Sequence, residues 1–400
     1  MTQPLAGAAA SARSRDDAFR GESLASVTAS LNSWVEIDLD ALSHNVRRLR
    51  EFVQPSELIA VVKANAYGAG IRGVAPALEA AGVGRFALVW VQEAVQLRAL
   101  GVTRPILVLG HATSADIPSI VENDITITCD SLDLGRALST AALDAGVRAR
   151  VHIHVDTGLH RDGLDPANAI RLAEALRALP ALDVEGLSTH MANADEADDS
   201  FSAEQEDAFA AVCETLSWVP YRHAANSATA LRRPGARLDG VRVGLALHGV
   251  QPDFTPAAGL RPVLQLKAHL IRIVDVAPGE GASYGLTWRA ARPSRLGLVP
   301  VGYADGWRRG LGNTGHVLVR GVRCPMVGRV CMDQFLVDVT DVPDADMGDE
   351  TVLIGAQGNE TITAEEVAGT AGTIPWDVLA SLQARLPRLF HRDGIVEARP

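Results

Sequence analysis

The 400-residue sequence lacks several features that would place it in a specialised class of protein. No apolar run is long enough to cross a bilayer, which predicts no membrane partner. The net charge is −11 and there is no basic run, which argues against nucleic acid as a general partner. The spacing of the four cysteines fits neither a metal site nor a disulfide framework, so we expect no metal and a reduced, cytoplasmic chain; they are Cys129, Cys213, Cys324 and Cys331.

The N-terminal segment, residues 1–33, lacks an apolar stretch of its own. It mixes Ala, Ser, Arg and acidic residues. Without an apolar h-region it does not resemble a secretory signal peptide. It also holds too little apolar surface to offset the entropy lost on ordering. We therefore predict a disordered tail over residues 1–33.

The rest of the chain has the composition of an ordinary globular protein, with 47% apolar and 21% charged residues. Between residues 34 and 262, eight short apolar runs alternate with helical patterns, most of which end in Gly. This alternation predicts a parallel (β/α)8 TIM barrel of the α/β class. A doubly wound open sheet is disfavoured, because no G-x-G-x-x-G follows the first run. The runs are LIAVV (58–62), FALVWV (86–91), ILVLG (106–110), ITITC (125–129), VHIHV (151–155), VEGLST (184–189), YRHAAN (221–226) and VRVGLAL (241–247).

The residue pattern changes in residues 263–400, where runs rich in β-forming residues are separated by turns that contain Gly, Pro and Asp. This pattern predicts a second, mostly antiparallel β domain. Two helical patterns follow, TAEEVAGTAG (363–372) and WDVLASLQARL (376–386).

Lys63 is the first candidate functional residue. It follows the first apolar run directly, in the stretch AVVKANAYGAG (60–70). The C-terminal ends of barrel strands are where such folds carry their chemistry. An amine partly stripped of water has a lowered pKa and can attack a carbonyl, including a cofactor aldehyde. The alternative is a lysine that extends from a strand end into solvent.

Polar residues also follow later runs, namely Asp156 and Arg161, His190, Asn226 and Ser227, and Arg242 with Gly244. Each has a structural alternative. His190 could be a core histidine, Asn226 and Ser227 could cap a helix, and Arg161 could pair with Asp156. Polar groups at matching positions of four strands are better explained together, by a site at the C-terminal face of the barrel.

A series of motifs over residues 34–392 resembles the alanine racemase family, fold-type III enzymes that use pyridoxal 5′-phosphate (PLP). They occur in the family's order and spacing: WVEIDLDAL, AVVKANAYG, VDTGLHRDG, GLSTHMANADE, HAANSATALRRP, VRVGLALHG, ASYGLTW, VGYADG, GRVCMDQF and LPRLF. The resemblance implies a cytoplasmic enzyme that interconverts L- and D-alanine and supplies D-alanine for peptidoglycan.

The resemblance also implies roles for individual residues. Lys63 would form the Schiff base with PLP and serve as one base, and Tyr284 would reach in from the other subunit as the second. Bases on opposite faces suit a reaction that removes and returns a Cα proton. This pairing implies a head-to-tail homodimer with composite sites. His190 and Arg242 would lie behind Tyr284, where a positive charge favours phenolate.

Further contacts follow from the same resemblance. Arg242 would face the pyridine nitrogen and keep it unprotonated, because a guanidinium does not give up its proton. The substrate carboxylate would be held by Arg161 and the backbone of Met332, and Tyr303 would line the entry. The remaining residues expected to contact the cofactor are Tyr67, His190, Asn226, Ser227, Gly244, Leu245 and Trp376.

Five positions depart from the family pattern: Ala69 for histidine, His154 for a lysine that is commonly carbamylated, Leu159-His160 for Met-Gly, His248 for tyrosine and Trp376 for tyrosine. A histidine cannot form a stable carbamate, so Arg161 must be held by a bound anion or a neighbouring side chain. Indole can donate a hydrogen bond but cannot accept one. The departures fit neutral drift, a shifted substrate or an altered response to inhibitors.

Other functions are compatible with parts of this pattern. A divergent fold-type III racemase for another small amino acid is the main alternative. A fold-type III decarboxylase would be expected to have a carboxylate in place of Arg242, and an aldolase would need a metal-ligand cluster. A non-catalytic PLP-binding protein of this fold would have a single domain, which the predicted β domain contradicts.

Overall fold

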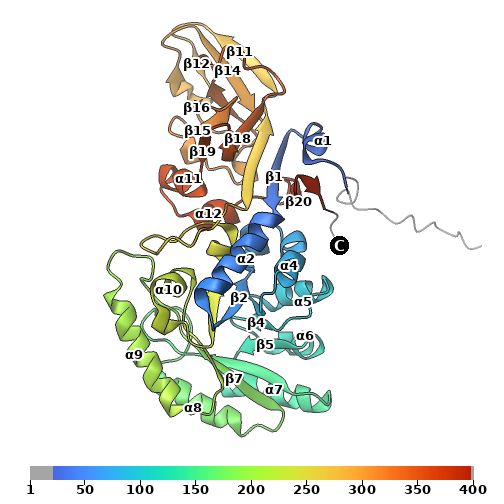
Figure 1. The fold of residues 1–400 in the computed structure, drawn as a ribbon, viewed down its shortest axis with the longest axis vertical. Coiled ribbons are helices and arrows are strands. Elements are labelled where there is room, and N and C mark those ends of the chain that lie inside the picture. The colour runs from blue at the N-terminus through green and yellow to red at the C-terminus, as the bar shows by residue number, and fades with distance from the viewer. Residues whose placement is uncertain (1–20, 398–400) are drawn as a thin grey trace, which may run out of the picture.

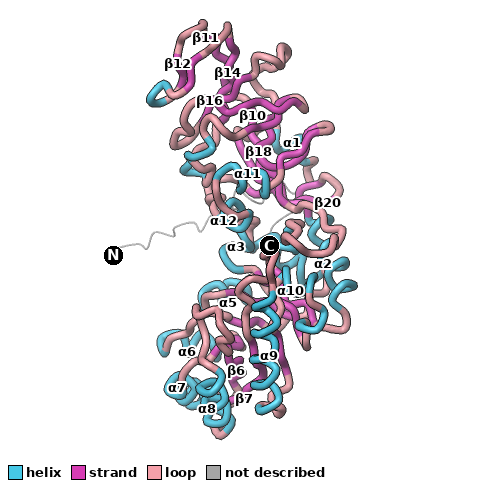
Figure 2. Tube along the Cα trace, turned by 90° about the vertical axis from the view of Figure 1, so that its left-hand side faces the viewer, coloured by secondary structure: helices cyan, strands magenta, loops and turns pink. Residues whose placement is uncertain are grey.

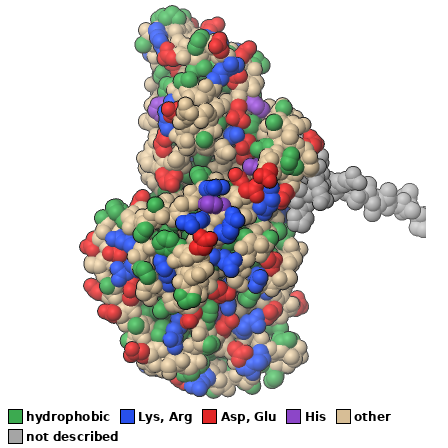
Figure 3. Space-filling model, in the orientation of Figure 1, with side chains coloured by type: hydrophobic (Ala, Val, Ile, Leu, Met, Phe, Trp, Pro, Cys, Tyr) green, Lys and Arg blue, Asp and Glu red, His purple; other side chains and the backbone are tan. Residues whose placement is uncertain are grey.

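The computed structural model describes residues 21–397. Two domains lie one above the other along the long axis, a barrel surrounded by helices and a β domain (Figures 1 and 2). On the face shown in Figure 3, acidic and basic side chains are interspersed over both domains. Within the described residues, no helix combines the length and the apolarity needed to cross a membrane.

The barrel sheet has eight parallel strands in the order β8-β7-β6-β5-β4-β3-β2-β9. Strand β2 pairs with both β3 and β9, so the first and last strands of the barrel meet. Near the remaining gap, Arg242 N–H donates to the carbonyl oxygen of Ala225 over 2.9 Å. The predicted TIM barrel is confirmed and the open sheet is wrong. The strands are β2 (Glu57–Val61), β3 (Arg85–Leu88), β4 (Ile106–Val108), β5 (Ile125–Thr128), β6 (Ala149–His154), β7 (Leu182–Ser188), β8 (Tyr221–His223) and β9 (Gly240–Val243).

Helices cover the outside of the barrel (Figure 1). They are α2 (Leu39–Val53), α4 (Ile71–Ala80), α5 (Val91–Ala99), α6 (Ile117–Glu122), α7 (Leu132–Asp144), α8 (Pro166–Arg177), α9 (Ser200–Thr215) and α10 (Ser227–Arg232). Successive side chains of a strand point to opposite faces. Ile59 and Val61 accordingly belong to an inner cluster with Ala87 and Leu107, while alternate residues such as Ala60 join the large core under the helices.

The second domain contains the other, mostly antiparallel sheet, in the order β11-β14-β17-β16-β15-β18-β10-β1-β20-β21 with β19 beside β18. This confirms the predicted β domain. Its strands are β10 (Leu264–His269), β11 (Arg272–Val276), β14 (Ser294–Val299), β15 (His316–Val319), β16 (Val322–Val327), β17 (Phe335–Asp338), β18 (Glu350–Gln357), β19 (Glu360–Ile362), β20 (Arg388–Arg392) and β21 (Ile395–Val396), with a separate pair of β12 (Gly281–Ala282) and β13 (Trp288–Arg289).

Strand β1 (Ser33–Asp38) lies in the sheet of the second domain, although it precedes the barrel in sequence. It pairs antiparallel with β10 and parallel with β20. The predicted start of the barrel at residue 34 therefore does not follow the sheets. Sequence distance conceals this pairing, because β1 and β20 are joined only through long-range backbone hydrogen bonds.

The predicted disorder of residues 1–33 is wrong for the part that the structure describes, and residues 1–20 lie outside it. Helix α1 (Leu24–Thr28) is capped by Ser23, whose hydroxyl accepts from the N–H of Ser26. Val27 is buried in a small cluster with Trp34, Leu389 and Val396. Packing against distant residues supplies the apolar contact that the segment lacks alone.

Helices α11 (Ala364–Ala371) and α12 (Pro375–Ala380) are the last two helices of the described residues. The second is shorter than the predicted pattern over 376–386. Beyond Ala380, the Gln383 N–H donates to the carbonyl oxygen of Asp305 over 3.1 Å instead of continuing the helix. A tertiary contact has thus replaced the intrahelical bonds.

Candidate active site

A cavity of about 770 Å³ lies where the barrel strands end, and α12 of the second domain contributes to its wall. This volume is in the range of small-molecule sites. The structure brings ten of the predicted site residues together in its lining: Lys63, Tyr67, Arg161, His190, Asn226, Ser227, Arg242, Gly244, Leu245 and Trp376. All but Trp376, which lies in α12, come from separate barrel strands and the loops that follow them, as expected for parallel strands whose C-terminal ends meet at one face.

Lys63 stands at the start of α3 (Lys63–Tyr67), a turn of unusual hand. Ala64, Asn65 and Ala66 all have φ near +54°, in the left-handed region. Such residues cost about 1–2 kcal/mol each and tend to occur at functional sites. The Glu93 carboxylate holds the turn by accepting from the Ala64 N–H over 2.8 Å. Burial, with a smaller contribution from Arg161, lowers the pKa of Lys63 below that of a free lysine.

The same turn packs against the second domain. At Gly68, which has a φ of +81°, a Cβ atom would lie 2.1 Å from the carbonyl oxygen of Leu379 in α12. The Gly68 carbonyl also accepts from Arg388 Nε over 3.0 Å. Both the positive φ and the close approach require glycine. The position of Lys63 therefore depends on both domains.

Arg242 is buried and its two Nη atoms are surrounded by protein acceptors. Nη1 donates to the Nδ1 and the carbonyl oxygen of His223 over 2.7 and 2.8 Å. Nη2 donates to the carbonyl oxygens of Thr189 and Ala224 over 2.7 and 2.9 Å, and His190 Nδ1 lies 3.1 Å away. The guanidinium is thereby held in one orientation.

His190 is neutral in this environment. Burial and the nearby Arg242 lower the pKa of its imidazole to about 2. The positive charge in this part of the cavity therefore belongs to Arg242 rather than to His190. His190 and Arg242, which the sequence analysis placed together behind Tyr284, therefore differ in charge.

Tyr67, Ser227 and Gly244 form a polar corner of the cavity. The Ser227 hydroxyl accepts from the Gly244 N–H over 3.2 Å. A Cβ atom at Gly244 would lie 2.2 Å from Tyr67 Oη, so the phenol occupies space that only glycine leaves open. Asn226 caps α10, with Oδ1 accepting from the Thr229 N–H over 2.9 Å. The helix-cap interpretation of Asn226 is therefore confirmed, because its amide oxygen accepts the capping hydrogen bond.

Arg161 lies at the cavity wall, where its Nε is 3.1 Å from the carboxylate of Asp162. The alternative pairing with Asp156 is wrong, because that carboxylate accepts from His160 Nδ1 over 2.9 Å. His154 is turned toward Ser188, with Nδ1 2.9 Å from the hydroxyl. Burial and Arg242 lower the pKa of His154 to about 4, which keeps it neutral. The charged neighbour of Arg161 is thus Asp162.

The departures from the family pattern lie in three places, and His160 is exposed outside the cavity. His154, Leu159 and Trp376 line the cavity. Ala69 is fully buried, and His248 is buried with its ring centroid 5.5 Å from that of Tyr67. Both residues therefore lie behind the cavity lining.

Tyr284, Tyr303 and Met332 do not line the cavity of their own chain. They are exposed on the β domain, with exposed fractions of 68%, 43% and 54%. Tyr284 follows β12, which lies at the end of the molecule remote from the barrel (Figures 1 and 2). The loops carrying the three residues are joined, because the N–H of Tyr303 donates to the carbonyl oxygen of Cys331 over 3.1 Å and Ser283 Oγ donates to that of Arg329 over 2.7 Å.

Sequence reasoning missed several residues of the cavity wall, including Trp90, His111, Asp162 and Ile374. Trp90 lies within the second apolar run, two residues after strand β3 ends at Leu88, and His111 comes directly after the third run. The rule that selected residues at the ends of the later strands would also have selected these two.

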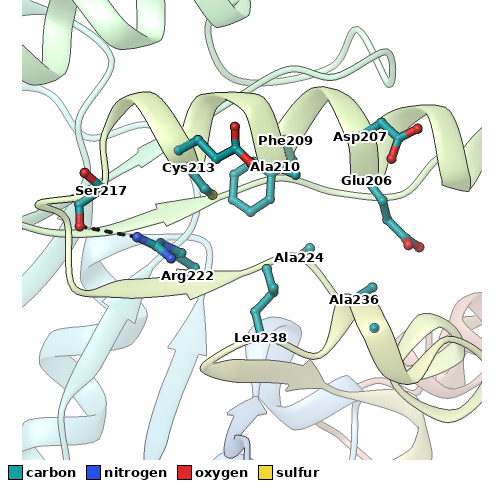
Figure 4. Close-up of a pocket in the computed structure, with 12 residues that line it drawn as sticks. Glu206, Asp207, Phe209, Ala210, Cys213, Ser217, Arg222, Ala224, Ala236 and Leu238 are labelled. Atoms are coloured by element: carbon teal, nitrogen blue, oxygen red, sulfur yellow. Dashed lines mark hydrogen bonds between the residues drawn. The ribbon is translucent and has the colours of Figure 1, made fainter.

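A second cavity of about 670 Å³ lies outside the barrel, between α9 and β8 with the segment that follows it (Figure 4). Phe209, Ala210 and Leu238 form much of its lining, and none of the predicted site residues contributes. Among the described residues, no group of three or more His, Cys, Asp or Glu side chains could hold a metal ion.

Comparison with known proteins identifies one family over almost the whole chain. Residues 37–252 match the family model for the alanine racemase N-terminal domain, and residues 263–390 match that for the C-terminal domain. The alanine racemase of Halothermothrix orenii is 39% identical over 365 residues, which are 90% of this chain and 96% of that protein. The alanine racemase of Desulfovibrio desulfuricans is 40% identical over 364 residues, 89% of this chain and 97% of that protein.

A solved structure shows the same similarity over the whole fold. The crystal structure of alanine racemase from Bacillus anthracis with bound L-Ala-P superposes with a TM-score of 0.84 and 37% identity, covering 92% of this chain and 96% of that one. Both family models, the relatives and the fold agree, and the chain belongs to the alanine racemase family.

Proposed function

We propose that the protein is a PLP-dependent racemase that interconverts L- and D-alanine in the cytoplasm and supplies D-alanine for peptidoglycan. The observation that carries this proposal is the pairing of Lys63 with the buried Arg242 in one cavity. A lysine with a lowered pKa suits attack on a cofactor aldehyde. A fixed guanidinium suits a pyridine nitrogen that is to remain unprotonated.

The cavity residues fit PLP in both shape and chemistry. The Tyr67 and Ser227 hydroxyls and the backbone N–H of Leu245 offer donors to a phosphate beside Gly244, whose own N–H donates to Ser227 Oγ until a phosphate accepts from it. When bound, PLP would act as the electron sink that makes the Cα proton of an amino acid removable. Trp376 would close the phosphate side of the cavity, and its indole N–H can only donate.

The protein's own side chains would then transfer the Cα proton and hold the substrate. Lys63 Nζ takes the Cα proton from one face of the substrate, and Tyr284 of the partner subunit gives one to the other face, with the roles exchanged in the reverse direction. Arg161, with Asp162 beside it, would hold the substrate carboxylate. The backbone of Met332 and the side chain of Tyr303 would complete the entry from the partner's β domain.

A head-to-tail homodimer is part of the proposal. Tyr284 is 68% exposed and lies on a loop far from the barrel of its own chain. Its backbone is strained, because Ser283 and Leu286 both have a positive φ of 62° and 46°. An exposed tyrosine on a strained loop is consistent with a residue that completes a site in a second copy.

The test uses both bases. The purified protein should show the visible absorption of bound PLP, and borohydride should fix the cofactor on Lys63 alone. L-Alanine in deuterated water should become D-alanine with deuterium at Cα. Tyr284→Phe should retain the cofactor but lose most of the racemisation. A mixed dimer of Lys63→Ala and Tyr284→Phe subunits should regain one working site. Labelling of another lysine, or a decarboxylated product, would refute the assignment.

A second candidate function is racemisation of a different small amino acid. The observation that favours it is that three departures from the family pattern, His154, Leu159 and Trp376, line the cavity. A racemisation screen across small amino acids at equal concentration decides between the two. The highest kcat/KM for alanine supports the first candidate, and a higher value for another amino acid supports the second.

A further inference from the structure

Four side chains form a continuous hydrogen-bonded chain inside the barrel, from the cavity toward its opposite end. Arg242 Nη1 is 2.7 Å from His223 Nδ1. His223 Nε2 is 2.8 Å from His152 Nδ1, and His152 Nε2 is 3.1 Å from a carboxylate oxygen of Glu185. Both histidines are fully buried. Only Arg242 lines the cavity, so the other three lie outside the site described above.

The two ends of this chain set the direction of every hydrogen bond in it. A guanidinium can only donate, so His223 Nδ1 must be the acceptor and its proton must be on Nε2. His223 Nε2–H then donates to His152 Nδ1, which leaves the His152 proton on Nε2. An ionised carboxylate can only accept, so His152 Nε2–H donates to Glu185. One arrangement of protons satisfies all four residues.

Burial supports this arrangement, since it lowers the pKa of both His152 and His223 and keeps the two rings neutral. An added proton on either ring would place two N–H groups against each other.

Glu185 is itself held in place as an ion. Arg85 donates to both of its oxygens over 2.9 and 3.1 Å. Burial by itself would raise the pKa of Glu185, but the hydrogen bonds from His152 and Arg85 and the Arg85 charge keep it well below its usual range. Gly186 leaves room for the adjacent ring, because a Cβ atom there would lie 2.6 Å from His152 Nδ1. The carboxylate and the ring are therefore built into the barrel rather than placed by chance on its surface.

We propose that Glu185 and His152 are positioning residues for Arg242, which they hold in its catalytic orientation by fixing the tautomer of His223. Without the carboxylate, the proton of His152 can move to Nδ1, from which it donates to His223 Nε2. The proton of His223 then moves to Nδ1, where its N–H faces the N–H groups of Arg242. The guanidinium would then lose a charge-assisted bond and shift. The effect on catalysis rests on the proposed function, whereas the tautomer of His223 does not.

The test compares two substitutions of His152. In His152→Asn, the amide oxygen takes the place of Nδ1 and can accept from His223 Nε2–H, so the hydrogen bond to His223 keeps its direction. His152→Leu removes both bonds. A third variant, Arg85→Met/Glu185→Met, removes the carboxylate together with its ion-pair partner, which avoids an unpaired buried charge. Asp183→Asn is the matched control, because it changes a carboxylate of the same strand that pairs with Arg148 at the surface.

The first readout is the tautomer of His223 in the cofactor-free protein, measured by long-range ¹H–¹⁵N spectra with ¹⁵N-labelled histidine. The wild type, His152→Asn and Asp183→Asn should show a neutral ring protonated at Nε2. Arg85→Met/Glu185→Met, in which His152 becomes free to donate from Nδ1 to His223, should show a proton at His223 Nδ1 in part of the molecules. A wild-type ring protonated at Nδ1, or an unchanged tautomer in Arg85→Met/Glu185→Met, would overturn the proposal.

The second readout is kinetic. His152→Leu should lower kcat about ten- to a hundredfold, the loss expected for one hydrogen bond to a charged group, with little change in KM. His152→Asn should restore most of kcat, which a simple packing role would not predict. An equal loss of kcat in His152→Asn and His152→Leu would also overturn the proposal. A tautomer change in a protein without racemase activity would instead show that the positioning is correct and the proposed function is wrong.

Discussion

His248 provides a test of how burial couples protonation to stability. It lies beside the cavity in the 3₁₀ turn Leu245–His248, with its ring packed against Tyr67 at 5.5 Å between centroids. Burial lowers its pKa from the ordinary 6.5 to about 4. The unfolded chain therefore binds more protons at this residue than the folded one between these two values. Its contribution to stability is complete above pH 6.5 and is lost as the pH falls toward 4.

The size of the effect follows from the two pKa values. Between pH 7.5 and 5.0, the difference in proton binding removes about 2 kcal/mol of stability through His248 alone. For a domain of 150–250 residues this corresponds to about 4–8 °C in melting temperature. His248→Phe keeps an aromatic ring against Tyr67 but cannot titrate. The fall in melting temperature from pH 7.5 to 5.0 should be smaller in this variant by about that amount.

The measurement is differential scanning fluorimetry of the purified wild type and variant at both pH values. Any packing strain from the larger ring shifts both melting temperatures of the variant and cancels in the difference. Val243→Ala is the control, because it removes buried methyl groups from β9 without changing a titratable group, and it should lower both melting temperatures equally. If His248→Phe showed the same pH dependence as the wild type, the assigned cost of protonating His248 would be refuted.

Two further predictions concern cavity shape and the β domain. Gly244→Ala should weaken PLP binding about 5- to 150-fold, the range for 1–3 kcal/mol of overpacking, because the new Cβ would lie 2.2 Å from Tyr67 Oη. Gly235→Ala is its control, since no described atom lies within 4 Å of that Cβ, and equal PLP affinities measured by titration would contradict the reasoning. Arg385→Leu should destabilise the protein by about 1–3 kcal/mol, because the buried Asp305 carboxylate loses its partner at 2.9 Å, and an unchanged melting temperature would show that this pair contributes nothing.

Local sequence patterns were sufficient to predict the barrel and most of the residues that line its cavity. Most barrel strands are short apolar runs whose β-branched residues mark them without reference to the rest of the chain, as LIAVV (58–62) does, whereas β3 and β8 contain no β-branched residue. Lys63 could be placed because it follows that run, and parallel strands bring their C-terminal ends to one face. Trp90 and His111 were open to the same rule.

The β domain was predictable in kind but not in its pairing. The alternating strands β15 and β16 could be recognised from the sequence, whereas the place of β1 beside β20 could not, because register is set by contacts between residues more than 300 positions apart. Residues 21–33 are likewise ordered by contacts with residues distant in the sequence, since Val27 packs against Leu389 and Val396. The end of α12 depends likewise on a bond to Asp305.

The sequence by itself determined which residues stand at the ends of the barrel strands, because side-chain alternation and strand length are local properties. Only the tertiary structure decided what those residues contact: Asp162 beside Arg161, His223 behind Arg242, and Tyr284 outside the cavity that Lys63 lines in its own chain. Hydrogen-bond partners and buried charges depend on where distant strands and loops come together. Local pattern does not encode that placement, and the positioning of Arg242 through His223, His152 and Glu185 therefore emerged only from the fold.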